Sequence, residues 1–133
     1  MGFIRQKMKV TLDALQTKSW NSSADEAVIP YVIAIDCSAT GASTFTYKLT
    51  NKVKVIDAMF IVVAANGGAT AQVQDTDGNA ITDAVSIATN KAIVRAGEID
   101  DDNYSEAKGN NLKVVQNANS DSCLAFITVI PIK

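Results

Sequence analysis

Residues 53–83 read VKVIDAMFIVVAANGGATAQVQDTDGNAITD, and this stretch decides the fold class. It opens with a run from Val53 to Ala65 that is rich in Val, Ile, Phe and Met, residues that pack well on a pleated surface. Asn66-Gly67-Gly68 then supplies residues that tolerate positive φ, as tight hairpin turns require. A short alternating strand, Thr70 to Gln74, and a second turn, Asp75 to Asn79, follow. The stretch therefore predicts β-strands joined by tight turns.

The run from Val53 to Ala65 carries apolar side chains on both faces and is too short to span a membrane. A strand with one solvated face would alternate apolar and polar residues instead. The last strand, Ser122–Ile132 (SCLAFITVIPI), shows the same two-sided pattern. We expect both strands to lie in one sheet. Because so short a chain has no further segment that could cover the second face of this sheet, we expect another subunit to cover it. The predicted contact residues are Ala58, Phe60, Val62, Cys123, Ala125 and Ile127.

Further strand signals follow along the chain, separated by turn residues every 8 to 12 positions. Strands are predicted at 28–37, 44–49, 91–99 and 112–116, and a weak strand or extended loop at 81–88. Asp100 to Ala107 is expected to form a short helical turn that ends near Gly109. About eight strands in this length predict an all-β fold, an eight-stranded antiparallel β-sandwich, with a jelly roll as the leading topology.

The two cysteines provide a test of that topology. They form neither a disulfide framework nor a metal site, so we expect both to be reduced and buried. In a jelly roll the first and last strands are antiparallel neighbours. Cys37, at the end of the first strand, and Cys123, at the start of the last, should therefore lie within a few residues of register.

Residues 1–27 are expected to form an N-terminal arm, and residues 28–133 the β-sandwich domain. Four basic residues and only Asp13 as an acidic one occur before residue 19, whereas the remainder is acidic. This distribution fits an arm that docks on an acidic neighbour, although a solvated tail is the alternative. Trp20 is either a lid over the core or an anchor in a neighbour. The predicted attachment residues are Arg5, Lys7, Lys9, Lys18 and Trp20.

The sequence gives little support for a catalytic site. Histidine is absent, which removes the commonest general base and zinc ligand. Asp75, Asp77 and Asn79 have the spacing that begins a calcium loop, but Gly78 comes one position early and a hairpin turn fits better. Asp100–Asp102 fits a solvated helix start better than a cation site. We therefore expect no enzyme, no cofactor and no metal. The net charge of −2 is too small to require nucleic acid, the first residues lack the apolar run of a signal peptide, and no membrane partner is expected.

The order of these segments resembles a known class of protein. The run VKVIDAMFIVVAANGGATAQVQDTDGNAITDAV, a later GNNLKVV strand and a closing strand ending ITVIPIK are similar to head decoration, or cement, proteins of tailed bacteriophages. The resemblance covers roughly residues 28–133 and carries over no functional residue. It implies a homotrimer on the capsid surface of a virion, made in the host cytoplasm, that clamps neighbouring major capsid proteins.

Three functional hypotheses remain from the sequence. The first is the cement protein. The second is a receptor- or glycan-binding head of a phage tail fibre or tailspike, which should follow a long fibrous shaft. The third is an enzyme, which should show a concave pocket with converging titratable groups.

Overall fold

A computed structural model describes residues 29–38, 43–65, 68–100, 105–117 and 122–132. These residues form nine strands and no helix. The strands are β1 (Tyr31–Cys37), β2 (Thr44–Lys48), β3 (Val53–Ala64), β4 (Thr70–Gln74), β5 (Val85–Ser86), β6 (Ile93–Arg95), β7 (Ser105–Glu106), β8 (Asn111–Gln116) and β9 (Ser122–Pro131). The all-β prediction is confirmed.

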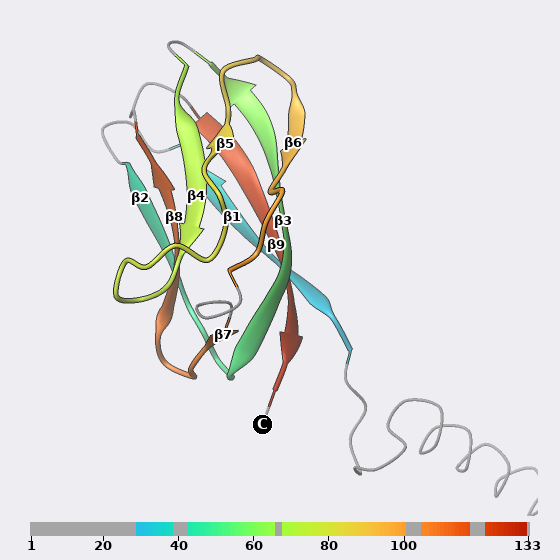
Figure 1. Cartoon of the computed structure of the whole chain (residues 1–133), viewed down its shortest axis with the longest axis vertical. Coiled ribbons are helices and arrows are strands. Elements are labelled where there is room, and N and C mark those ends of the chain that lie inside the picture. Colours follow the sequence, from blue (N-terminus) through green and yellow to red (C-terminus); the bar gives the residue numbers. More distant parts are fainter. Residues whose placement is uncertain (1–28, 39–42, 66–67, 101–104, 118–121, 133) are drawn as a thin grey trace, which may run out of the picture.

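The strands form two antiparallel sheets that face each other (Figure 1). The first sheet has the order β1-β9-β3-β6, and β7 pairs with the other end of β3. The second has the order β2-β8-β4-β5. The long strands β3 and β9 belong to one sheet, as their two-sided apolar character predicted, and they lie side by side in its middle.

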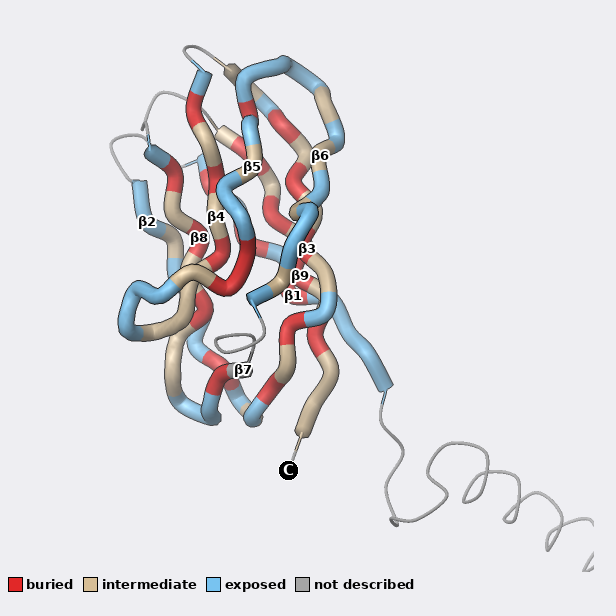
Figure 2. The backbone as a smooth tube through the Cα atoms, in the orientation of Figure 1, coloured by how far each residue is buried: buried red, intermediate tan, exposed pale blue. Residues whose placement is uncertain are grey.

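The core lies between the two sheets, and Figure 2 shows buried positions alternating with more exposed ones along the strands. In β9 every second residue from Cys123 to Val129 is fully buried. In β8, which belongs to the opposite sheet, Leu112 and Val114 are likewise fully buried. Alternation of this kind is the period of two that a pleated strand imposes on its side chains. Each sheet therefore presents one face to the core and one face away from it.

Two β-bulges interrupt the pairing of β3 with β9, one between Val55 and Asp57 and one between Val62 and Ala64. An extra residue in one strand reverses which alternate positions point inward. Val53 and Val55 are buried before the first bulge, and Ala58, Phe60 and Val62 are buried after it. The first bulge therefore changes the inward face of β3 from odd to even residue numbers.

The predicted helical turn at Asp100–Ala107 is wrong where the structure describes it, because Ser105–Glu106 is the strand β7 and pairs with Val53–Lys54. Tertiary pairing outweighs the helix-start signal of the preceding aspartates. Gly109 still lies in a turn, with φ of 86°. The described chain thus has nine strands rather than eight.

Cys37 and Cys123 are direct register partners in the antiparallel pair of β1 and β9. Both are free and fully buried. The predicted neighbourhood of the first and last strands is confirmed. Residues 1–28, which include the predicted arm, lie outside the described residues.

Candidate subunit interface

The side of the β1-β9-β3-β6 sheet that faces away from the core is largely apolar. Register pairs place two rows of residues across this side: Asp36, Leu124, Ile61 and Ile93 in one, and Ala34, Phe126, Met59 and Arg95 in the next. Val32 lies opposite Thr128 in the adjacent row. We define the outer apolar face as Val32, Ala34, Met59, Ile61, Ile93, Leu124 and Phe126.

Solvent reaches the outer apolar face in the single chain. Ile93 is 67% exposed and Val32 is 54% exposed, while Phe126 and Leu124 in the middle of the sheet are half-buried. Val63, at the second bulge, is a further exposed hydrophobic residue at 52%. Single exposed apolar residues are ordinary on protein surfaces, but apolar residues contiguous over four strands indicate a surface that binds something.

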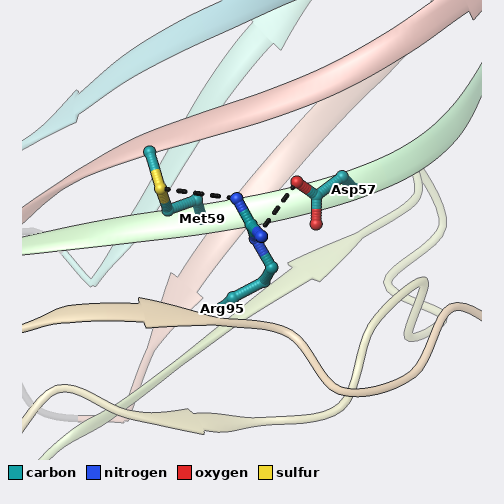
Figure 3. A network of polar contacts seen from close by, with 3 residues as sticks. All are labelled: Asp57, Met59 and Arg95. Carbon is teal, nitrogen blue, oxygen red and sulfur yellow. Dashed lines mark hydrogen bonds and ion pairs between the residues drawn. The ribbon is translucent and has the colours of Figure 1, made fainter.

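One ion pair lies on this side of the sheet, next to the apolar rows (Figure 3). Arg95 Nε lies 3.3 Å from Asp57 Oδ2, and the Arg95 guanidinium also contacts the Met59 sulfur at 4.0 Å. The Arg95 side chain is 64% exposed, so the pair contributes about 0–1 kcal/mol to the stability of the single chain. The ion pair places two opposite charges beside the apolar residues of this surface.

The six predicted contact residues lie on the opposite side. Ala58, Phe60, Val62, Cys123, Ala125 and Ile127 are all at most 1% exposed and form part of the core between the sheets. A partner subunit cannot reach them in this fold, so the choice of these six as contact residues is wrong, although both strands do lie in one sheet as expected. On β3 and β9 the residues of the outer apolar face are each one position further along the chain, and β1 and β6 extend this face.

The predicted attachment residues Arg5, Lys7, Lys9, Lys18 and Trp20 all lie outside the described residues. The outer apolar face is therefore defined from described residues alone.

Asp75 organises the turn at residues 75–79. Its carboxylate accepts hydrogen bonds from the Asp77 and Asn79 N–H groups, at 2.9 and 2.8 Å, and from Asn79 Nδ2, at 2.9 Å. Gly78 has φ of 92°, a left-handed conformation that glycine adopts without steric cost. Burial raises the pKa of Asp75, but these hydrogen bonds outweigh it and lower the pKa below 3.8. The Asp75 carboxylate and the Asn79 amide thus hydrogen-bond to each other within the turn, and Asp77 contributes its backbone N–H.

Glu106 was not singled out from the sequence, yet it connects two turns. The side chain is 7% exposed and accepts hydrogen bonds from Thr76 N at 2.7 Å, Ala107 N at 3.0 Å and Asn110 Nδ2 at 2.7 Å. A buried carboxylate without such donors would be costly. Thr76 is distant from Glu106 in the sequence, so the sequence does not reveal this contact. The only local signal is an acidic residue shortly before a glycine turn.

Within the described ranges, no three acidic, cysteine or histidine side chains cluster as metal ligands. Asp100 is exposed, and Asp101 and Asp102 lie outside those ranges. The described residues also include no helix of the length and apolarity needed to cross a membrane.

Comparison with known proteins adds no relative. No protein family, curated protein or solved structure matches this chain.

Proposed function

We propose that this chain is a structural virion protein, a capsid decoration or cement protein that forms homotrimers and clamps neighbouring major capsid subunits. The observation that carries the proposal is the outer apolar face, which spans all four main strands of one sheet and has no cover from the described chain. Removing an exposed Val or Ile side chain from water contributes about 1.5–3 kcal/mol. Several such residues on one face therefore favour association.

The strand pairing supports a jelly roll as the body of this protein. In that fold, a long hairpin of eight strands folds over, so the first strand pairs with the last, the second with the seventh, the third with the sixth and the fourth with the fifth. If β6 and β7 count as one interrupted strand, the pairs β1–β9, β2–β8, β3–β6 and β4–β5 follow this scheme. The resemblance to decoration proteins noted from the sequence rests on the same order.

Trimeric assembly and capsid attachment are assigned to different parts of the chain. The outer apolar face provides the contact between subunits. The basic segment before residue 19 supplies the attachment to an acidic capsid surface, because it concentrates positive charge in a chain that is otherwise acidic. The place of action is the capsid surface, after synthesis in the host cytoplasm.

The proposal is tested by cosedimentation of the purified full chain with expanded heads of the phage that encodes it. We expect saturable binding with a fixed ratio of trimers to capsid lattice sites. Bacterial surface polysaccharide is the matched alternative ligand. Binding to polysaccharide and not to heads would contradict the proposal and support a tail-fibre head instead.

A further inference from the structure

The two buried thiols lie at one position of the sheet. Cys37 ends the edge strand β1, and Cys123 stands directly opposite it near the start of β9. Both side chains belong to the inner face, and both are fully buried. Two cysteines from distant parts of the chain thus lie opposite each other on the buried side of the sheet.

The geometry of this pair is close to that of a disulfide. Directly opposed residues on antiparallel strands have Cα atoms about 4.5–5.5 Å apart, within the range that a disulfide spans. Their Cβ atoms are about 4.5–5.5 Å apart, slightly more than the roughly 3.5–4.5 Å that the bond prefers. A bond here requires a small approach of β1 toward β9. The resulting strain would make the disulfide readily reducible.

Gln116 distinguishes the two sulfurs. Its side chain reaches across from β8, and Nε2 lies 3.4 Å from Cys123 Sγ and 3.1 Å from the Cys37 carbonyl oxygen. Hydrogen bonds from Cys37 and Gln116 lower the pKa of Cys123, against its burial. The hydrogen bond to Cys123, together with burial, raises the pKa of Cys37. Cys123 is therefore the thiol that more readily becomes the nucleophilic thiolate.

The oxygen atom of the Gln116 amide could accept a hydrogen bond from an oxidised cysteine. Gln116 is 2% exposed, and its Oε1 has no hydrogen-bond partner among the described residues. A buried acceptor without a donor is unusual in a folded protein. The hydroxyl of a sulfenic acid on Cys123 would supply that donor.

We propose that Cys37 and Cys123 are a modification site, at which a hydroperoxide converts two thiols into a reversible disulfide that staples the edge strand β1 to β9. The Cys123 thiolate attacks one peroxide oxygen, so that an S–O bond forms, the O–O bond breaks, and the released hydroxide takes up the thiol proton as water. The Cys37 sulfur then attacks the Cys123 sulfur, so that the S–S bond forms and the S–O bond breaks. The leaving hydroxide takes the Cys37 proton as a second water. Two thiols are oxidised and one hydrogen peroxide is reduced to two waters.

Access to the site is provided by the edge of the sheet. Cys37 is the last residue of β1, which pairs with β9 on one side only. Opening the end of an edge strand breaks few hydrogen bonds, so local opening precedes global unfolding there. Oxidation is therefore expected to be slow but to occur in the folded protein.

The test uses the full chain with hydrogen peroxide as the probe, followed by denaturation, alkylation with iodoacetamide and measurement of intact mass. We expect neither cysteine of the oxidised protein to be alkylated, and prior reduction to restore alkylation of both. On a non-reducing gel the product should run as a single chain. Cys37→Ser and Cys123→Ser each replace one sulfur with the smaller oxygen and should each block the internal disulfide.

A thermal melt supplies the second measurement. The oxidised wild type should melt several degrees above the reduced protein, because the bond closes a long loop in the unfolded chain, while the two serine variants show no such rise. The proposal is overturned if both thiols stay alkylatable after peroxide, if the disulfide forms only between chains, or if oxidation leaves the melting temperature unchanged. This inference is independent of the proposed function.

Discussion

Glu106 shows how one side chain can fix the end of the sandwich that lies near β7. Its carboxylate receives three hydrogen bonds from two turns that are separated in sequence. Nothing in the local sequence could predict this role, because Thr76 and Glu106 meet only after the sheets have paired. The prediction of a helical turn here failed for the same reason.

Replacing Glu106 with alanine should lower the free energy of unfolding by about 1–3 kcal/mol, because the substitution leaves partly buried donors without an acceptor. Urea denaturation measures this change. Glu98→Ala, at an exposed position, is the matched control and should change stability by less than about 0.5 kcal/mol. Equal effects of the two substitutions would contradict the role assigned to Glu106.

Asp75 should make stability depend on pH in acid. The folded-state pKa of Asp75 is lowered, so the carboxylate stabilises the fold fully above the unfolded value near 3.8. This contribution is lost as the pH falls from that value through the lower folded pKa. In Asp75→Asn the ionisation is absent. The wild type should therefore be more stable than the variant at pH 7, and the difference should shrink below about pH 4. A difference in urea midpoint that stays constant from pH 7 to pH 2.5 would count against the hydrogen-bond pattern of this turn.

At the scale of the element, the apolar pattern of β3 predicts its sheet but not its inward face. Its two-sided apolar character correctly placed it in the same sheet as β9, where the two strands are neighbours. The same character concealed which face points inward, since apolarity alone does not distinguish a core from an interface. Lys54 and Asp57 held the missing signal: charged residues are rarely fully buried, and two outward residues three apart require a bulge between them.

Two phenylalanines on adjacent strands test this assignment of faces. Phe60 on β3 is fully buried, whereas Phe126 on β9 is half-buried on the outer apolar face. Phe60→Ala should lower the free energy of unfolding by about 3–5 kcal/mol. Phe126→Ala should cost the isolated subunit clearly less and should weaken self-association instead. Urea denaturation at low protein concentration, with light scattering in parallel, separates the two effects. A greater loss of subunit stability from Phe126→Ala would reverse the assignment.

At the scale of the whole molecule, the turn signals and the number of strands predicted a topology in which the first and last strands pair. The register of Cys37 and Cys123 follows from that pairing and is found. The strand count was one short, because the two-residue strand β7 has no periodic pattern of its own and lies where a helical turn was expected, whereas β5 lies within the weak strand predicted at 81–88. Such short strands exist only where a longer neighbour offers hydrogen-bond partners.

The basic segment gives a prediction at this scale. Deletion of residues 1–18 should leave the melting temperature unchanged, because the described sandwich begins its first strand at Tyr31. The same deletion should weaken binding to phage heads and reduce the salt dependence of that binding, since it removes four positive charges. A truncated chain that binds heads as tightly as the full chain would refute the role of this segment.

Light scattering coupled to size-exclusion chromatography tests the central claim, assembly through the outer apolar face, most directly. The full chain should have about three times its mass of 14.1 kDa at micromolar concentration. The double variant Val32→Glu/Ile93→Glu should elute as a folded monomer, because both positions are more than half exposed in the subunit and charges there oppose only the contact. Thr46→Glu, at an exposed position of the other sheet, should remain trimeric. A monomeric wild type, or a double variant that still forms trimers, would contradict the account.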